Sequence, residues 1–488
     1  MKKSIHIIGS GFSALAASCY LAKAGFDVTV FEKNSTVGGR ARQLKKDGFT
    51  FDIGPTWYWM PDVFERFFND FGKKPSDYYD LEKLDPAYSV YFKDGTDVEI
   101  SADLDKIYDL FESEESGSSI HLRKFLKSAE FNYKTAIEDL VYKPGVSPLE
   151  LVTPVTMRRV SQFFSTISNT VRKNIKSKKL IQILEFPVLF LGAKPNNTPA
   201  FYNFMNYADF GLGTWHPKGG MYKVIEAMVS LAKNLGVNFQ TNANVEKIHI
   251  NDQGSVESIT VNAEEIQSDL LLSGADYHHT ETLLNKQYRQ YSEKYWEKKT
   301  FAPSSLLFYV GFDKKMKNVN HHTLFFDADF DAHAVEIYDK PDWPKDPLFY
   351  ASFPSMTDEN CAPDGNEAGI FLIPLAPGIE DTEALREKYF NIIIERFERL
   401  TNQRVKNNII FKKSFCVNDF IEDYNSYKGN AYGMANTLMQ TAFLRPKIKS
   451  KKVHNLYFTG QLTVPGPGVP PSLISGKIAS ELILKTHA

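Results

Sequence analysis

Three small residues and one acid near the N-terminus have the types and spacing of a site that binds a dinucleotide. In GSGFSA, Gly9, Gly11 and Ala14 occupy the positions of a G-x-G-x-x-G/A motif, and Glu32 follows later. Gly9 permits a tight turn, Gly11 lets backbone approach a pyrophosphate, and Ala14 lets a helix pack closely on a sheet. Glu32 lies at the right distance to accept hydrogen bonds from an adenosine ribose.

The elements that must position these residues are predicted in the required order. Residues 5–8 form a short apolar strand, residues 12–24 a helix that stops before Gly25, and residues 28–31 a second strand that ends at Glu32. Phe12 and Ser13 open the helix, where free backbone N–H groups suit phosphate oxygens. A glycine motif alone is weak evidence, but strand, helix, strand and acid together indicate a dinucleotide cofactor.

The residues after Glu32 distinguish between NAD and FAD. GGRAR begins at Gly38 and FDIGP covers residues 51–55. Taken alone, GGR would be a turn followed by a basic strand. Placed after Glu32, it resembles the pattern of a large family of FAD-dependent enzymes that includes amine oxidases, protoporphyrinogen oxidase and phytoene desaturases. The resemblance implies FAD. It places a first group of residues at the pyrophosphate and a second near the isoalloxazine ring: Gly38, Gly39 and Arg40; Gly54, Pro55, Thr56 and Trp57.

Two later stretches resemble the same family. WHPKGGMYKVIEAM (215–228) precedes predicted strands at 237–241 and 245–250, and in the family the equivalent of Val245 holds the adenine. NLYFTGQLTVPGPGVPPSLISG begins at Asn455, and the resemblance places Gly460, Gly468 and Val469 at the flavin. A helix N-terminus there would favour an anionic reduced flavin. Without the family pattern, GPGVPP would be a stiff polyproline linker. Bacterial phytoene desaturases often have a His where this chain has Val464.

The resemblance implies an α/β fold with a discontinuous, Rossmann-like FAD-binding domain. We assign this domain to residues 1–75, 211–290 and 445–488. An inserted α+β substrate-binding domain would comprise residues 76–210 and 291–444, including a helical region that could associate with a membrane. Hydrophobic residues make up 43% of the 488 residues, as expected for a folded protein.

The run GPTWYWMPDVFERFF is unusually aromatic, with six aromatic residues among fifteen. Phe64, Phe67 and Phe68 recur at helical spacing, which is typical of ordinary core packing. Trp57, Tyr58 and Trp59 follow the flavin motif directly and are predicted to wall an apolar channel at the ring. The sequence leaves both roles open for the run as a whole.

Residues 151–184 contain no acidic residue and carry seven positive charges. Apolar residues recur among them at spacings of three and four: Val160, Phe163, Phe164, Ile167, Val171 and Ile175. A basic amphipathic helix of this kind suits an anionic bilayer surface, although a domain helix with a solvated basic face gives the same pattern. No run of 18 apolar residues predicts a spanning helix, and a secretory signal is the lesser interpretation of the N-terminus. We therefore expect a cytoplasmic protein attached peripherally to the inner face of the membrane.

The overall resemblance is to bacterial-type phytoene and related carotenoid desaturases. It is carried by GPTWYWMPDVFERFF, by SSLLFYVGFD from Ser304 to Asp313, and by GQLTVPGPGVPPSLISG. It implies a lipophilic polyene substrate, phytoene first, which loses a hydride to flavin N5 and a proton from the neighbouring carbon. A quinone or oxygen would then accept the electrons. The alternatives are 3,4-desaturation of a later hydroxylated or monocyclic carotene, an amine or porphyrinogen oxidase, and a flavin-free prenyl-lipid carrier.

No catalytic residue is predicted. Five histidines are candidate bases, but a surface or structural histidine is the more frequent case: His216, His278, His279, His321 and His322. Three scattered cysteines without a Cys/His cluster predict neither a zinc site nor a disulfide framework, and they favour a reducing compartment. A net charge of −2 gives no electrostatic indication of nucleic-acid binding.

Overall fold

A five-stranded parallel sheet holds the two ends of the chain together in the computed structural model, which describes residues 3–138 and 140–487. Its strand order is β19-β13-β1-β2-β9. These strands come from three distant parts of the chain: β1 (Ser4–Ile8), β2 (Asp27–Phe31), β9 (Asn238–Gln240), β13 (Leu270–Ser273) and β19 (Leu456–Phe458). The predicted strands at 5–8 and 28–31 are confirmed, and buried Ile5 and Ile7 show why the apolar N-terminal strand is central.

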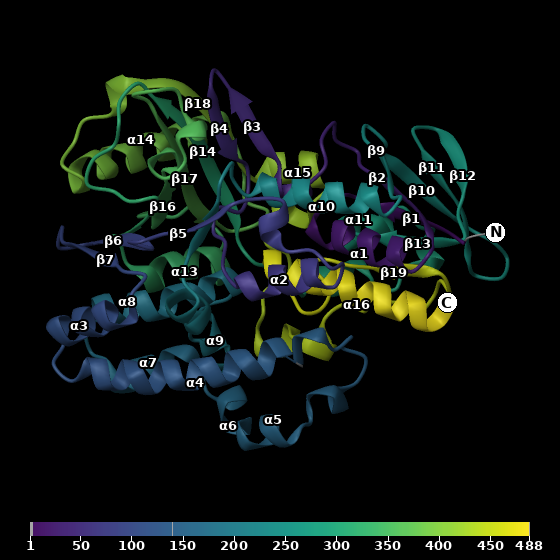
Figure 1. Ribbon diagram of the computed structural model, residues 1–488, viewed down its shortest axis with the longest axis horizontal. Helices are drawn as coiled ribbons and strands as arrows, with labels where there is room; N and C mark the ends of the chain where they lie inside the picture. Colours follow the sequence, from purple (N-terminus) through teal and green to yellow (C-terminus); the bar gives the residue numbers. More distant parts are fainter. Residues whose placement is uncertain (1–2, 139, 488) are drawn as a thin grey trace.

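Three helices cover this sheet: α1 (Phe12–Lys23), α10 (Tyr222–Asn234) and α16 (Val469–His487). α1 and α16 lie side by side (Figure 1). They approach so closely that a Cβ atom on Gly476 of α16 would lie 2.3 Å from the carbonyl oxygen of Ser13. Val224, Ile225 and Met228 form one apolar face of α10, and all three are buried.

A second, seven-stranded mixed sheet has the order β18-β14-β17-β16-β15-β6-β7. Its strands are β6 (Tyr88–Phe92), β7 (Asp97–Ile100), β14 (Ser304–Phe312), β15 (His322–Phe326), β16 (Phe349–Ser352), β17 (Glu367–Leu375) and β18 (Ile409–Phe415). The long helix α14 (Glu383–Leu400) packs on it through Phe397, whose ring contacts Phe325 and Phe371. A separate three-stranded antiparallel sheet, at the right of Figure 1, consists of β10 (Val245–Ile250), β11 (Val256–Val261) and β12 (Glu264–Gln267).

Small hairpins and short helices connect these layers. The hairpin of β3 (Gln43–Lys46) and β4 (Phe49–Asp52) follows the GGR motif, and β5 (Leu81–Lys83) pairs with β8 (Trp215–Pro217). Five further α-helices lie outside the helical layer described below: α2 (Pro61–Asn69), α11 (Tyr277–Thr282), α12 (Glu293–Glu297), α13 (Phe330–Tyr338) and α15 (Val417–Tyr424).

A helical layer lies below the second sheet in Figure 1. It contains α3 (Leu104–Glu114), α4 (Ser118–Glu138), α5 (Pro154–Arg158), α6 (Val160–Phe164), α7 (Ile167–Asn174), α8 (Lys178–Glu185) and α9 (Phe204–Asn206). In the described residues, no helix is both long and apolar enough to span a bilayer.

Residues 151–184 are largely helical, but the prediction of one basic amphipathic helix is wrong, because the region folds as several short helices. Thr166 and Ser177 interrupt it, and each side-chain oxygen caps the helix that follows. Ile167, Val171 and Ile175 are buried, whereas Phe164 is 80% exposed. The side chains of Leu151, Arg158 and Val160 lie outside the described part of the structure.

Candidate active site

One large cavity begins at the carboxyl ends of β1, β2 and β19 and continues between the second sheet and the helical layer. Open α/β sheets bind their ligands at this edge. The cavity volume is about 740 Å³, within the usual range for ligand sites. Every residue predicted to meet the cofactor lines this cavity except Ala14. Ala14 packs instead against Gly274, as its role in helix–sheet packing requires.

Glycines allow three of the predicted motifs to meet through their backbones. A Cβ atom on Gly39 would lie 3.1 Å from the Cα atom of Gly11, so the GGR turn rests directly on the first glycine motif. A Cβ atom on Gly54 would lie 2.0 Å from the carbonyl oxygen of Arg40. A side chain at Gly54 would therefore separate FDIGP from GGR, which explains a glycine at that position without reference to any ligand.

Glu32 is fixed at the end of the cavity lined by GSGFSA and GGR, which we call the nucleotide end after the predicted role of these motifs. Its carboxylate accepts hydrogen bonds from Ser10 N (3.1 Å), Ser10 Oγ (2.5 Å) and Asn34 N (2.9 Å). Ala243 N donates to the Glu32 carbonyl oxygen at 2.9 Å, which brings the start of β10 and Val245 beside the acid. Ser10 and Asn34 were not singled out from the sequence, although both are short polar residues that flank the predicted motifs.

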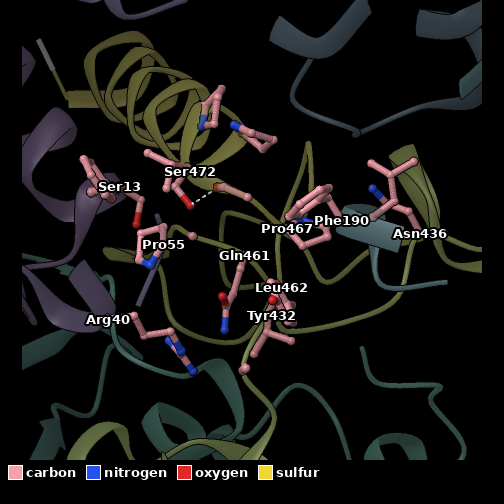
Figure 2. Close-up of a pocket in the computed structure, with 18 of the residues that line it drawn as sticks. Ser13, Arg40, Pro55, Phe190, Tyr432, Asn436, Gln461, Leu462, Pro467 and Ser472 are labelled. Carbon is pink, nitrogen blue, oxygen red and sulfur yellow. Dashed lines mark hydrogen bonds between the residues drawn. The ribbon is translucent and has the colours of Figure 1, made fainter. Parts of the chain in front are cut away.

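Arg40 carries a partly buried guanidinium that has no carboxylate within 4 Å among the described residues. Its Nη2 atom donates to Ser426 Oγ at 3.1 Å, and its buried Nε atom has no hydrogen-bond partner among those residues. Burial lowers the pKa of Arg40. Figure 2 shows Arg40 beside Gln461 and Pro55 around the same hollow. A positive group placed in this way fits the pyrophosphate of FAD.

Asp52 joins the FDIGP motif to the PKGGM loop. Its carboxylate accepts hydrogen bonds from Met221 N at 2.7 Å and Tyr222 N at 3.2 Å, at the start of α10. A Cβ atom on Gly220 would lie 2.5 Å from Asp52 Oδ2, so the loop glycine leaves room for the acid. Burial raises the pKa of Asp52 to about 6. Asp52 therefore supports the cavity wall from behind.

Arg445 holds the proline-rich loop before α16, a role that no local sequence pattern indicates. This arginine is 2% exposed, and it donates to the carbonyl oxygens of Thr463 (2.8 Å) and Gln461 (2.7 Å). Its partners are brought together only by the tertiary fold, so no local pattern could reveal the contact. Pro470 and Pro471 lack N–H groups, so the start of α16 offers fewer donors than the sequence argument assumed.

Trp57 lies where the nucleotide half of the cavity meets an aromatic half. Its ring stacks on His322, with centroids 4.0 Å apart, and its centroid lies 5.7 Å from that of Phe186 and 5.8 Å from that of Phe190. Phe190 and Pro467 of the proline-rich loop both line this part of the cavity (Figure 2). The aromatic half continues to further ring-bearing residues: Phe163, Phe201, Phe204, Phe326, Phe330 and Phe443.

Tyr58 does not face the cavity, which corrects the prediction for this residue. It is fully buried, stacks on Phe64 at 4.2 Å and hydrogen-bonds Tyr79 through its hydroxyl group. Consecutive side chains of extended backbone point to opposite faces. Of the three residues 57–59, Trp57 and Trp59 therefore line the cavity and Tyr58 does not. Phe64, Phe67 and Phe68 of α2 are buried, which confirms their predicted role in core packing.

The five candidate histidines separate into two groups. His278 lies near the surface, 2.8 Å from Glu293, and His279 lies at the nucleotide end within 3.1 Å of Asn425. The other three are buried and lie together behind Trp57: His216, His321 and His322.

Comparison with known families now adds to this geometry. The family model described as flavin containing amine oxidoreductase matches residues 12–484. The chain belongs to this family. Its cofactor is FAD, and the protein is an oxidoreductase. The glycine contacts, the fixed carboxylate of Glu32 and the guanidinium of Arg40 in the cavity wall fit such a cofactor. Within the family, the chain groups with the carotenoid desaturases.

The relatives that support this grouping match over their whole length. A carotenoid 3,4-desaturase of Haloarcula japonica is 41% identical over 100% of this chain and 99% of its own length. A zeta-carotene-forming phytoene desaturase of Myxococcus xanthus is 31% identical over 99% and 94%. Among solved structures, an oxidoreductase from Methanosarcina mazei has a TM-score of 0.64 at 16% identity, covering 98% of this chain and 100% of its own. Putrescine oxidase likewise has a TM-score of 0.64 at 12% identity, covering 99% of both chains. These two structures share the fold of the flavoprotein.

Proposed function

We propose that this flavoprotein is a carotenoid desaturase, which removes two hydrogens from a CH–CH bond of a long polyene. The observation that carries the proposal is that one cavity has a nucleotide half and an aromatic half, which meet at Trp57. A polyene has no charge to recognise, so it must be held by shape and by contacts with aromatic rings. The full-length carotenoid desaturase relatives support the same assignment.

The bond that we favour is the 3,4 bond of a carotenoid, with phytoene as the second candidate. The relative named carotenoid 3,4-desaturase is 41% identical, whereas the one named zeta-carotene-forming phytoene desaturase is 31% identical. This order reverses the one expected from the sequence alone. Both candidates require the same chemistry and an apolar cavity of similar width.

For the cofactor, we propose that the GGR and GSGFSA motifs hold the pyrophosphate. Glu32 and Val245 would hold the adenosine, and the loop from Gly460 to Val469 would border the ring together with residues 54–57. FAD supplies a two-electron acceptor that can take a hydride at N5. The chain itself excludes water, orients the polyene along the aromatic half and brings the reacting carbons to Trp57. Orientation of this kind lowers barriers by up to about 7–11 kcal/mol.

We also propose that the cavity draws its substrate from a membrane. Exposed apolar side chains adjoin lining residues along the chain: Leu149 (74%) lies two positions after Ser147, and Phe164 (80%) follows Phe163. A further lining segment, residues 438–444, adds the exposed side chain of Met439 (71%). Lys447 Nζ connects this segment to Gly145, because it donates to the carbonyl oxygens of Phe443 and Gly145, each at 2.6 Å. Exposed apolar patches of this kind are typical of sites that contact membranes or partner proteins.

The basic region contributes less to this surface than its sequence suggested. Arg172 forms a paired hydrogen bond with Glu185, and Lys179 lies 2.9 Å from Asp94. These charges are used within the protein, so the proposed membrane contact depends mainly on the apolar side chains. The inner membrane face, the cytoplasmic location and a quinone or oxygen acceptor stay predictions.

Expression in pigment-free bacteria tests the function. One strain should supply phytoene and another an acyclic carotenoid that is still saturated at its 3,4 bond. A product with one more conjugated double bond in the second strain alone would support 3,4-desaturation, and products from phytoene would support the second candidate. No new polyene in either strain would contradict the proposal.

A further inference from the structure

Three buried histidines form a contiguous group behind the aromatic wall of the cavity. The ring of His322, at the start of β15, stacks on Trp57 at an angle of 11°. Its centroid lies 4.5 Å from that of His321, which lies 4.6 Å from that of His216 in β8. Each of the three is at most 5% exposed. Buried imidazoles in mutual contact are costly unless their nitrogens are used, and the proposed cofactor site does not use them.

Tyr350 connects this group to the cavity. Its hydroxyl oxygen lies 2.7 Å from His322 Nδ1 and 2.8 Å from Thr56 Oγ1. Thr56 and Tyr350 both line the cavity beside Trp57. The other ring nitrogen, His322 Nε2, is buried and has no hydrogen-bond partner among the described residues. One end of the group therefore lies where the substrate carbons would be placed.

The other end approaches the surface at residues 356–360. His216 Nε2 lies 3.5 Å from Asp358 Oδ2, and His321 Nδ1 lies 2.9 Å from Thr357 Oγ1. The neighbouring Met356 is 41% exposed. The histidines therefore extend from the cavity wall almost to solvent.

Building on the proposed function, we propose that Tyr350 and His322 accept the proton released by desaturation, and that His321 and His216 pass it toward Asp358. When a CH–CH bond becomes a double bond, one carbon gives up a hydride to FAD and its neighbour gives up a proton. The electron pair of that second C–H bond becomes the new π bond. The Tyr350 oxygen takes the proton while its own hydrogen moves to His322 Nδ1.

The surroundings suit a base that stays neutral between turnovers. Burial lowers the pKa of His321 and His322 well below the usual value, and each is lowered further by neighbouring histidines. The carboxylates near His216 are Asp358, whose pKa is lowered chiefly by the neighbouring imidazole of His216, and Asp52. A neutral imidazole is strong enough, because a C–H bond beside a delocalised carbocation is highly acidic. The rings of His321 and His322 touch edge to face, so a ring rotation must complete the transfer between them.

The first test measures single turnovers of the FAD-loaded enzyme with a carotenoid in liposomes. We expect His322→Gln and Tyr350→Phe to lower the rate roughly a hundredfold, with unchanged FAD content and KM, and to alter the solvent isotope effect. Imidazole should restore part of the rate of His322→Ala. His6→Gln is the matched control, since His6 is buried with an unpartnered Nδ1 atom far from the group and should keep the wild-type rate. Wild-type rates in both test variants would overturn the relay.

The second test does not need turnover. In protein labelled with ¹⁵N-histidine, the signal lost in His322→Gln identifies His322. We expect its ring to be neutral from pH 6 to pH 8 with the proton on Nε2, and Tyr350→Phe to shift that tautomer balance. A charged ring, or one that does not respond to Tyr350→Phe, would overturn the proposal. If the wild-type enzyme forms no polyene, the proposed function is contradicted. If the wild-type enzyme is active and the variants keep its rate, only the proposed proton relay is contradicted.

Discussion

The Trp57 ring stacks on His322 and also lines the cavity. We expect Trp57→Ala to lower kcat/KM for the polyene by about 10- to 100-fold, because about 1.5–3 kcal/mol of aromatic contact is lost. FAD content, measured by absorbance after gel filtration, should fall much less.

The matched control for Trp57 is Phe64→Leu, in the same aromatic run but on the side that faces the core. It should lower the melting temperature and leave kcat/KM of the folded enzyme unchanged. If Trp57→Ala loses FAD and turnover to the same extent, Trp57 is structural rather than a wall of the substrate site.

Arg40 is held in the cavity wall with no carboxylate partner in the described part of the chain, so the folded protein without FAD gains little from its charge. We expect Arg40→Met to weaken FAD binding by about 2–5 kcal/mol, roughly 30-fold or more in Kd. The free energy of unfolding of the FAD-free protein should be unchanged or slightly higher. Titration of FAD-free protein with FAD and urea unfolding measure the two effects. A loss of stability without a loss of FAD affinity would mean that GGR is only a turn.

At the scale of elements, β6 meets the short π-helix η7 (Tyr207–Gly211) through a buried carboxyl group, that of Asp209. Tyr88 donates to Asp209 Oδ2 at 2.8 Å, and burial raises the pKa of Asp209 to about 8. The unfolded chain has a pKa near 3.9, so between these values the folded state binds the extra proton. Stability from this group is therefore present below pH 4 and is lost as pH rises toward 8.

Asp209→Asn should remove that pH dependence, since the amide is neutral throughout and can still accept from Tyr88. Between pH 6 and pH 8 we expect the free energy of unfolding of the wild type to fall by roughly 2 kcal/mol relative to the variant. Urea unfolding at both pH values measures this. Parallel curves for the two proteins would show that Asp209 is already charged at pH 6.

Elements with a local pattern were predictable, and contacts between distant elements were not. The strands of the first motif, α1 and the buried face of α10 follow from periodicity and glycine positions. The supposed basic helix was wrong because Thr166 and Ser177 cap new helices within an otherwise periodic stretch. The prediction for Tyr58 was wrong because consecutive side chains of extended backbone point to opposite faces, so Tyr58 faces the core while Trp57 and Trp59 face the cavity. Arg445 and the histidine group depend on partners far away in sequence, and no spacing rule reports those.

At the scale of the whole molecule, both ends of the chain and a middle segment build one parallel sheet, and the second sheet and the helical layer supply further walls of the cavity (Figure 1). The division into domains at 1–75, 211–290 and 445–488 stays a prediction. The exposed apolar side chains adjoin segments that line the cavity, so the proposed membrane contact would let a polyene pass from lipid to the ring without crossing water.

Flotation with liposomes tests this surface. Leu149→Ser combined with Phe164→Ser should lower the bound fraction at least roughly tenfold, because each buried side chain contributes about 1.5–3 kcal/mol. Ile120→Ser combined with Ile410→Ser is the control, since both side chains are exposed and neither these residues nor their chain neighbours line the cavity. Equal binding of the two double variants would place the membrane contact elsewhere.

Anaerobic mixing tests the central claim most directly. Yellow, FAD-loaded protein is mixed with carotenoid liposomes in the absence of oxygen, while flavin absorbance and the polyene spectrum are recorded together. The flavin absorbance should bleach in step with the appearance of one additional conjugated double bond per flavin. Bleaching by an amine or a porphyrinogen, with no response to any carotenoid, would contradict the account.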